Sequence, residues 1–308
     1  MKLSYLLYSV MPTVVTCFPI ADYLAKKIKT ALEPRFDVIV SDQEHIAEDL
    51  FKADVFCGHA KVPVDWKGVV EAGKLKWIQS SAAGMDHCLT APVIASDILV
   101  TSSSGLFADQ VAEQTMALLL GLVRSMPVFY RAQQRREFIR RPTRDLHGMT
   151  VGIVGFGGNG ERIAEVLAPF GVHIVATDLF PSKPPPHVEA VWTADALPRL
   201  LRESDVVILC APLNSQTTGM IAREQFAIMK PESLLVNVGR GPLVVESDLV
   251  DALREEKLSA AGLDVTEIEP LPADSPLWDM ENVVITPHVG AQSAQRVDTS
   301  TAFFCENL

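Results

Sequence analysis

The glycine-rich segment at residues 151–160, Val-Gly-Ile-Val-Gly-Phe-Gly-Gly-Asn-Gly, has the composition and spacing to bind a dinucleotide. It ends an apolar run and opens a helical pattern, and its glycines match GxGxxG. We expect Gly155 to allow a tight turn, Gly157 to let the backbone approach a pyrophosphate, and Gly160 to let helix and strand pack closely. The first N–H groups of the following helix would then face the phosphates.

Asp178 closes the next predicted strand, 18 residues beyond Gly160. An acidic group there can accept hydrogen bonds from both ribose hydroxyls and would repel a 2′-phosphate. Leu179 and Phe180 follow it, and neither is an arginine. The pattern therefore favours NAD over NADP. The alternative interpretation is a glycine-rich turn in some other α/β protein.

Three further segments place polar side chains directly after predicted strands. Arg240 lies in residues 236–242, Asp264 and Glu269 in 262–270, and His288 in 285–290. Open parallel sheets bind ligands at the carboxyl ends of their strands. Taken alone, the arginine would be a surface ion pair, the glutamate a loop charge, and the histidine a helix-cap or core residue. Together they indicate a catalytic group.

The elements that must position these residues form two successive alternating units. Alternation of strands and helices indicates a parallel sheet covered on both faces. In the first unit we predict helices near 21–32, 43–51 and 65–72, and strands at Leu3–Tyr8, Phe36–Val40, Asp54–Cys57, Leu75–Gln79 and Ile98–Val100. In the second we predict a helix over Glu161–Phe170, and strands at Val151–Val154, His173–Thr177, Asp205–Cys210, Leu234–Val238, Ala260–Asp264 and Val283–Thr286.

A long apolar helix over Ala108–Arg124 and a basic segment connect the two units. The helix composition suits a buried or subunit-facing element. The basic run after Pro127 is interpreted as a solvated arm or a salt-bridged dimer contact, with anionic-substrate binding as the alternative. Its arginines are Arg131, Arg135, Arg136, Arg140, Arg141 and Arg144.

Composition narrows the function classes. The chain has 308 residues, 48% of them hydrophobic, which can fill two cores. Its net charge of −11 argues against nucleic-acid binding, which normally uses a basic face. Five scattered cysteines without a CxxC pair suit a reducing compartment, and the seven histidines show no metal-ligand spacing, so we expect no metal site.

The N-terminus has two interpretations. Lys2 followed by the apolar run Leu3–Val15 resembles a signal peptide, or it opens a first strand that leads into a helix from about Pro19 to Leu32. We favour the strand because Pro12 interrupts the run. No other apolar stretch is long and uncharged enough to cross a bilayer, and the expected location is the cytoplasm.

Taken in order, these motifs closely resemble the D-isomer-specific 2-hydroxyacid dehydrogenase family. The resemblance covers almost the whole chain and includes Ser80–Asp86, which looks like the family's substrate-binding loop. It implies an α/β protein in which a Rossmann coenzyme domain, 102–286, is inserted into a flavodoxin-like substrate domain, 1–101 and 287–308. It also implies a homodimer through the helix and arm near 105–147. Relatives usually continue past the position of Leu308.

The resemblance also assigns roles. Arg240 would grip the substrate carboxylate and carbonyl with its planar fork. His288 would be the general acid and base, and Glu269 would fix its tautomer and favour its protonated form. Backbone N–H groups around Ala83 and Gly84 would hold the carboxylate. His59 and His87 lie near this cleft, and neither is favoured as functional.

The same resemblance outlines the cofactor contacts. Asp264 would meet the nicotinamide amide, and Cys210, Ala211 and Pro212 would border the adenine side, with Cys210 itself acting as a small apolar filler. The expected NAD-binding residues are Gly155, Gly157, Gly158, Asn159, Gly160, Asp178, Cys210, Ala211, Pro212, Thr217, Val238, Gly239, Arg240, Asp264, His288 and Gly290.

The leading functional hypothesis is an NAD-dependent reductase of glyoxylate, hydroxypyruvate or a related 2-keto acid. Formate or phosphite oxidation is a second possibility within the family, but formate enzymes of this kind carry Gln where this chain has Glu269. An NAD-sensing binding protein of the co-repressor type, on the same fold, is the hypothesis from a different class.

Overall fold

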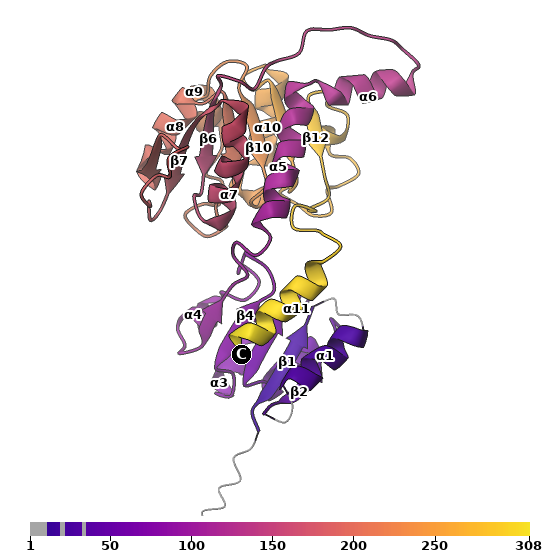
Figure 1. Cartoon of the computed structure of the whole chain (residues 1–308), viewed down its shortest axis with the longest axis vertical. Coiled ribbons are helices and arrows are strands. Elements are labelled where there is room, and N and C mark those ends of the chain that lie inside the picture. Colours follow the sequence, from indigo (N-terminus) through magenta and orange to yellow (C-terminus); the bar gives the residue numbers. More distant parts are fainter. Residues whose placement is uncertain (1–10, 19–21, 33–34) are drawn as a thin grey trace, which may run out of the picture. The chain divides into compact units, whose positions relative to one another are not determined.

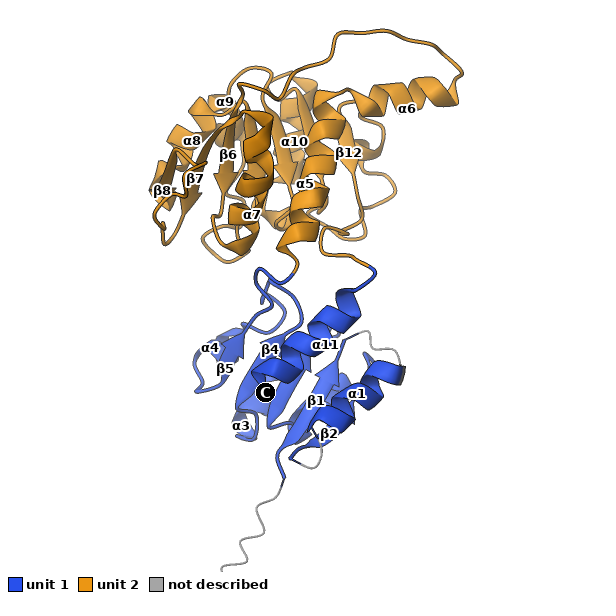
Figure 2. Ribbon diagram, in the orientation of Figure 1, with its two compact units in different colours: residues 1–106, 294–308 blue, residues 107–293 orange. Residues whose placement is uncertain are grey.

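The computed structural model describes residues 11–18, 22–32 and 35–308 (Figure 1). The chain divides into two compact units, coloured separately in Figure 2. Unit 1 comprises Met1–Leu106 and Ala294–Leu308, and unit 2 comprises Phe107–Ser293. Each unit is an α/β layer structure around one parallel sheet, which confirms the predicted fold class.

Unit 1 contains a five-stranded parallel sheet in the order β2-β1-β3-β4-β5, the flavodoxin-like order. Helices α1 and α11 cover one face of this sheet, where Val14, Val55 and Phe304 share a core. The shorter helices cover the other face. The elements are β1 Thr13–Cys17, α1 Asp22–Leu32, β2 Asp37–Val40, α2 Ile46–Asp49, β3 Val55–Gly58, α3 Trp66–Glu71, β4 Trp77–Ser80, α4 Ala91–Ile94, β5 Leu99–Thr101 and α11 Arg296–Asn307.

Unit 2 contains a seven-stranded parallel sheet in the order β12-β11-β10-β9-β6-β7-β8. This is the Rossmann order with one added strand, and the direction of strand addition reverses between β6 and β9. The elements are α5 Ala108–Val123, α6 Met126–Gln134, β6 Thr150–Val154, α7 Gly158–Leu167, β7 His173–Asp178, β8 Ala190–Thr193, α8 Leu197–Glu203, β9 Val206–Leu209, α9 Arg223–Ile228, β10 Leu234–Asn237, α10 Glu246–Arg254, β11 Ala260–Leu263 and β12 Val283–Ile285.

Alternate strand residues of unit 2 enter two different cores. Val151 and Ile153 pack with α5 and α7 on one face. Val154 and Leu209 pack with α8 and α10 on the other. Because both faces are covered, the central strands are apolar throughout, and this is why they were readable from sequence.

Several elements differ from the sequence prediction, among them the short helix α4, which was not predicted. The strand predicted at Leu3–Tyr8 lies outside the described residues, while the first described strand, Thr13–Cys17, was not predicted; it follows Pro12, a position that strands tolerate. Strand β8 was missed because it is short and only partly buried. The segment after Ser125 forms helix α6 before the arm, since Pro127 sits in the first helical turn, where proline is accepted.

Candidate active site

The glycine motif lies between β6 and α7. Gly155 has a φ of 92°, and a Cβ there would lie 2.7 Å from the backbone of Ala211 on the neighbouring strand's loop, so a side chain is excluded. A Cβ on Gly157 would meet open space. Helix α7 begins at Gly158, and its first N–H groups have no acceptor within the helix. The loop therefore has the room and the donors to fit a dinucleotide pyrophosphate.

Asp178 holds this loop from the end of β7. Its Oδ2 accepts a hydrogen bond from Phe156 N at 2.7 Å, and its Oδ1 accepts one from Phe180 N at 2.9 Å. Each oxygen keeps a further lone pair, and the residue is only partly buried. The carboxylate is thus fixed in position with capacity left for a ligand hydroxyl.

Cys210 follows β9 at the point where strand addition reverses. Its thiol donates to Gly155 O at 2.9 Å, and burial raises its pKa to about 12. Ala211 and Pro212 continue the loop, and Thr217 Oγ1 closes it by donating to Pro212 O at 2.7 Å. This loop and the glycine loop lie side by side at the sheet edge where such folds bind nucleotides.

The side chain of Asn237 shapes the turn that carries Arg240. Its Oδ1 accepts from Gly239 N at 3.1 Å, and its Nδ2 donates to Arg240 O at 3.0 Å. The guanidinium of Arg240 donates to Gly239 O at 2.8 Å. Val238 N donates to Leu209 O on the adjacent strand. Asn237 is 1% exposed, so the turn is fixed from within the protein.

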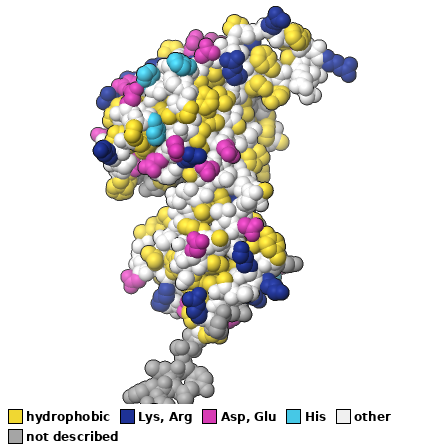
Figure 3. Space-filling view, in the orientation of Figure 1, with side chains coloured by type: hydrophobic (Ala, Val, Ile, Leu, Met, Phe, Trp, Pro, Cys, Tyr) yellow, Lys and Arg dark blue, Asp and Glu magenta, His cyan; other side chains and the backbone are white. Residues whose placement is uncertain are grey.

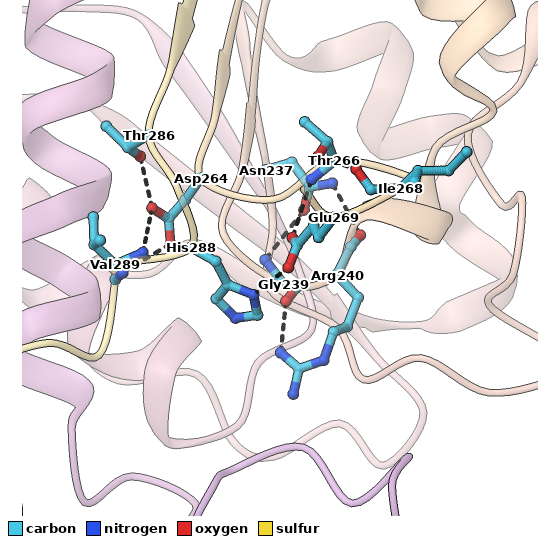
Figure 4. Close-up of polar contacts among 11 residues, drawn as sticks. Asn237, Gly239, Arg240, Asp264, Thr266, Ile268, Glu269, Thr286, His288 and Val289 are labelled. Atoms are coloured by element: carbon cyan, nitrogen blue, oxygen red, sulfur yellow. Dashed lines mark hydrogen bonds and ion pairs between the residues drawn. The ribbon is translucent and has the colours of Figure 1, made fainter. Parts of the chain in front are cut away.

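His288 and Glu269 form a direct pair (Figure 4). His288 Nδ1 lies 2.8 Å from Glu269 Oε2, and Thr266 N donates to Glu269 Oε1 at 3.3 Å. Figure 4 places Arg240 beside this pair. An imidazole that uses Nδ1 for a carboxylate keeps Nε2 for another partner, the arrangement of a positioned acid–base catalyst.

Asp264 lies at the end of β11, directly behind this pair. It is 2% exposed, and its carboxylate accepts hydrogen bonds from Thr286 Oγ1, Val289 N and Gly290 N. These donors belong to the protein itself. The predicted contact of Asp264 with the nicotinamide amide stays a prediction.

Within unit 1, the loop after β4 is tightly organised. Ser80 Oγ donates to Ala82 O at 3.1 Å and lies 3.3 Å from Gly84 O, while Ser103 N donates to Ala82 O at 3.0 Å. Ala83 is exposed at the tip of this turn. The carbonyl groups of Ala82 and Gly84 are thus directed inward, to Ser80 and Ser103.

His59 and His87, which the sequence did not favour as functional, stack on each other. Their ring centroids are 3.9 Å apart, and the rings are inclined by 11°. His59 follows β3 and His87 follows the turn after β4, so the contact joins two neighbouring loops of unit 1. The stacking therefore also holds the end of the loop Ser80–Asp86, which the sequence predicts to bind substrate.

The basic segment makes both long-range and local contacts within unit 2. Arg131 donates to Met280 O at 3.0 Å, and Arg135 pairs with Glu137 at 2.9 Å.

Across the described residues, no helix is both long and apolar enough to span a membrane. Nor does this part of the chain group three or more His, Cys, Asp or Glu side chains so that they could hold a metal ion.

Sequence reasoning missed four residues that shape the site: Asn237, Thr266, Thr286 and Gln114. Asn237 ends β10, and Thr286 directly follows β12 two residues before His288, so their positions carried a signal. Thr266 acts through its backbone N–H, which any residue offers. Gln114 comes from α5, far away in sequence, and its contribution is visible only in the fold.

Together, the two sheets, the glycine loop and the Arg, Glu and His set define a class of protein, the dinucleotide-binding dehydrogenases. Residues 116–290 match the family model of the D-isomer specific 2-hydroxyacid dehydrogenase, NAD binding domain. The chain belongs to this family, whose members are oxidoreductases that act on CH–OH groups.

Known members show the range of the family. A glyoxylate reductase of Thermococcus onnurineus is 32% identical over 84% of this chain and 82% of its own length. A D-3-phosphoglycerate dehydrogenase of Methanocaldococcus jannaschii is 32% identical over 86% of this chain, which spans only 51% of that relative. The solved NADPH-dependent glyoxylate/hydroxypyruvate reductase of Sinorhizobium meliloti, in complex with NADP and sulfate, aligns with a TM-score of 0.79 and 26% identity over 96% of both chains. These enzymes lend no support to the co-repressor hypothesis.

Proposed function

We propose that this chain is an NAD-dependent dehydrogenase that transfers a hydride between nicotinamide and a small 2-keto acid or D-2-hydroxy acid, with glyoxylate and hydroxypyruvate as the first candidates. The observation that carries the proposal is the 2.8 Å His288–Glu269 pair beside Arg240, in the same unit as the glycine loop. Unit 2 is then the coenzyme domain and unit 1 the substrate domain.

The chain's own residues would handle charge and protons. Arg240 holds the carboxylate and adjacent carbonyl of the substrate through its planar fork, and its permanent charge polarises the carbonyl. His288 passes a proton from Nε2 to the carbonyl oxygen during reduction and takes it back during oxidation. Glu269 holds Nδ1 and fixes the orientation of the ring. The bound nicotinamide cofactor supplies or accepts the hydride.

The remaining recognition would come from backbone groups. N–H groups around Ala83 and Gly84 hold the carboxylate, which is supported by the inward direction of their loop's carbonyls toward Ser80 and Ser103. The glyoxylate reductase relative supports a substrate with a very small side chain.

We infer a preference for NAD from Asp178. Backbone donors fix its carboxylate at the end of β7, where it would accept from the ribose hydroxyls and repel a 2′-phosphate. The two residues after it, Leu179 and Phe180, are apolar and exposed, and offer no cation to a phosphate. The Sinorhizobium meliloti structure holds NADP, and the rates of this chain with NADH and with NADPH distinguish the two cofactors.

We also propose a homodimer formed through α5, α6 and the arm, in a reducing compartment such as the cytoplasm. A cavity of about 620 Å³ lies along the edge strand β12, lined by Ala117, Gly121, Tyr130 and Trp278 among others. Phe138 on the arm is 92% exposed, and Figure 3 shows hydrophobic and basic side chains together over this region. All five cysteines are free thiols, which suits that compartment.

The oligomer test uses a substitution that the folded monomer can accept. A Cβ on Gly121 would meet nothing within 4 Å, so Gly121→Arg starts from open space and adds bulk and charge to the groove. Sedimentation analysis should show a dimer for the wild type and for a Phe180→Arg control, and a monomer for Gly121→Arg. A wild-type monomer at micromolar concentration would contradict the dimer.

The activity test is a turnover panel. Initial rates are measured with NADH and NADPH against glyoxylate, hydroxypyruvate, pyruvate and phosphohydroxypyruvate. We expect reduction of at least one small 2-keto acid with NADH, and a strong loss in Arg240→Lys, which keeps the charge but not the fork. Absence of turnover on every acid with both cofactors would overturn the proposed function.

The kinetics of Glu269→Gln test the positioning of the proton donor. Reduction requires a proton on His288, and Glu269 orients the ring through the 2.8 Å contact with Nδ1. Glu269→Gln should therefore lower kcat and leave KM for NADH largely unchanged. A Glu269→Gln variant with wild-type kcat would show that Glu269 does not position the acid.

A further inference from the structure

A continuous chain of hydrogen bonds links helix α5 to the loop that carries His288. Gln114 Nε2 on α5 donates to Thr286 Oγ1 at 2.8 Å. Thr286 Oγ1 then donates to Asp264 Oδ1 at 2.6 Å (Figure 4). None of the reacting groups proposed above belongs to Gln114 or Thr286, so their side chains have a separate task.

The direction of these bonds is fixed by chemistry. A hydroxyl has one proton to donate, and an ionised carboxylate only accepts, so the Thr286 proton points to Asp264. The atom of Gln114 that faces Thr286 must then be the amide nitrogen. The donors and acceptors in this chain of hydrogen bonds are therefore all assigned. Removing the Thr286 hydroxyl would interrupt the chain of hydrogen bonds at its centre.

Asp264 in turn accepts hydrogen bonds from the backbone of the loop that carries His288, called the catalytic loop below. Its main-chain oxygen accepts from His288 N at 2.7 Å, its Oδ1 accepts from Val289 N at 3.0 Å, and its Oδ2 accepts from Gly290 N at 2.8 Å. The successive N–H groups of Val289 and Gly290 thus converge on one buried carboxylate, as in an anion-binding nest, and the preceding N–H of His288 binds the main-chain oxygen of the same residue. A Cβ on Gly290 would lie 2.8 Å from Oδ2, so the approach is close.

The backbone of His288 needs such support. Its φ is 53°, in the left-handed region that residues with a side chain rarely adopt. Conformations of this kind persist only where the surroundings enforce them. In this conformation Nδ1 reaches Glu269 at 2.8 Å. The geometry of the acid–base pair therefore depends on the loop backbone, which the nest holds.

We infer that Gln114 and Thr286 are positioning residues for His288: they orient the Asp264 carboxylate, and through the nest they hold the catalytic loop in the conformation that pairs His288 with Glu269. The inference rests on the proposed function for the role of His288. It adds a partly buried helix residue and the hydroxyl of the residue after β12 to the parts of the protein that set the rate.

The kinetic test compares Thr286→Val, which removes the hydroxyl at nearly constant shape, with Thr286→Ser, which restores it. Misplacement of a catalytic group costs up to about 100-fold, so we expect kcat to fall about 10- to 100-fold in the valine variant with little change in KM for NADH. The serine variant should recover most of the loss, and Gln114→Met should show a smaller loss. A valine variant with wild-type kcat, or a serine variant equally impaired, would overturn the inference.

Thr115 supplies the matched control. It is a fully buried threonine next to Gln114 on α5, and its hydroxyl donates within the helix to Val111 O at 2.7 Å. Thr115→Val therefore removes a hydroxyl that is more deeply buried than that of Thr286 and that does not reach the loop carrying His288. We expect wild-type kcat; the same loss as in Thr286→Val would assign the effect to general packing and overturn the inference.

A measurement without turnover separates this inference from the proposed function. Long-range proton–nitrogen correlation spectra of ¹⁵N-histidine-labelled protein report the state of the His288 ring nitrogens, with Glu269→Gln as the reference for a broken pair. The Thr286→Val signals should move toward that reference and those of Thr286→Ser should not. Unchanged His288 signals in Thr286→Val would overturn the inference, while a wild type inactive on all 2-keto acids would overturn only the proposed function.

Discussion

Asp178 and Asp264 stand at equivalent places, the carboxyl ends of β7 and β11, yet the structure uses them differently. Asp178 is partly exposed, and each of its oxygens accepts one backbone hydrogen bond. Asp264 is 2% exposed, and its carboxylate accepts three hydrogen bonds from the protein. The first carboxylate keeps capacity for a ligand, whereas the second organises the chain around it.

The contrast teaches that position on the sheet does not assign the role of a carboxylate. Both residues look like ligand groups in the sequence, because both follow buried strands at the binding edge. The number of internal donors and the degree of burial decide between them. Substitutions in the two loops can test this difference.

The largest effect should come from replacing His288, the side chain carried by the loop that Asp264 holds. His288→Ala should lower the rate by about 10²- to 10⁴-fold, the usual contribution of a positioned acid–base group. The Asp178 loop, by contrast, offers backbone groups, and Phe180 is 83% exposed. Phe180→Ala should leave kcat nearly unchanged. Similar losses of rate in His288→Ala and Phe180→Ala, measured as initial rates, would contradict the difference proposed between the two loops.

Substituting the two carboxylates themselves should separate stability from binding. Asp264→Asn places an amide against buried donors, and the loss of charged hydrogen bonds should lower the free energy of unfolding by about 3 kcal/mol. Asp178→Asn, partly exposed, should lower it by less than about 1 kcal/mol. Urea denaturation of both variants checks this order. Equal losses would mean that burial does not distinguish the two sites.

Cofactor choice should respond to Asp178. The wild type should prefer NADH over NADPH by at least about tenfold in kcat/KM, or about 1.4 kcal/mol. Asp178→Ala should narrow the gap because the repulsion of a 2′-phosphate is removed. The kinetic constants for both cofactors provide the test. Equal use of both by the wild type would refute the assignment of Asp178.

The smallest effect concerns Cys210, the thiol beneath the loop that Asp178 holds. Since burial raises its pKa to about 12, the thiol stays protonated at pH 7–9 and should resist iodoacetamide in the native protein. Labelling, followed by peptide mass spectrometry, should increase with pH without reaching a plateau below pH 10. Labelling that reaches a plateau near pH 9, the ordinary pKa of a thiol, would show that the Cys210 thiol is accessible to solvent.

The sequence alone predicted the two parallel sheets because their central strands are buried on both faces and apolar throughout. The grouping of Arg240, Glu269 and His288 was also predictable, since each of them stands in a short motif after such a strand. Strands that lack this signal were missed: Thr13–Cys17 is hidden in a longer apolar run broken by Pro12, and β8 is only partly buried.

Only the tertiary structure decided how the site is held. Gln114 is separated from Thr286 by 172 positions, and no local pattern links a helix amide to a strand-end hydroxyl. The left-handed conformation of His288 depends on the same long-range contacts, because a histidine has no intrinsic preference strong enough to enforce it. Local composition fixes where a strand ends, but hydrogen bonds between distant segments determine what the residue at that end does.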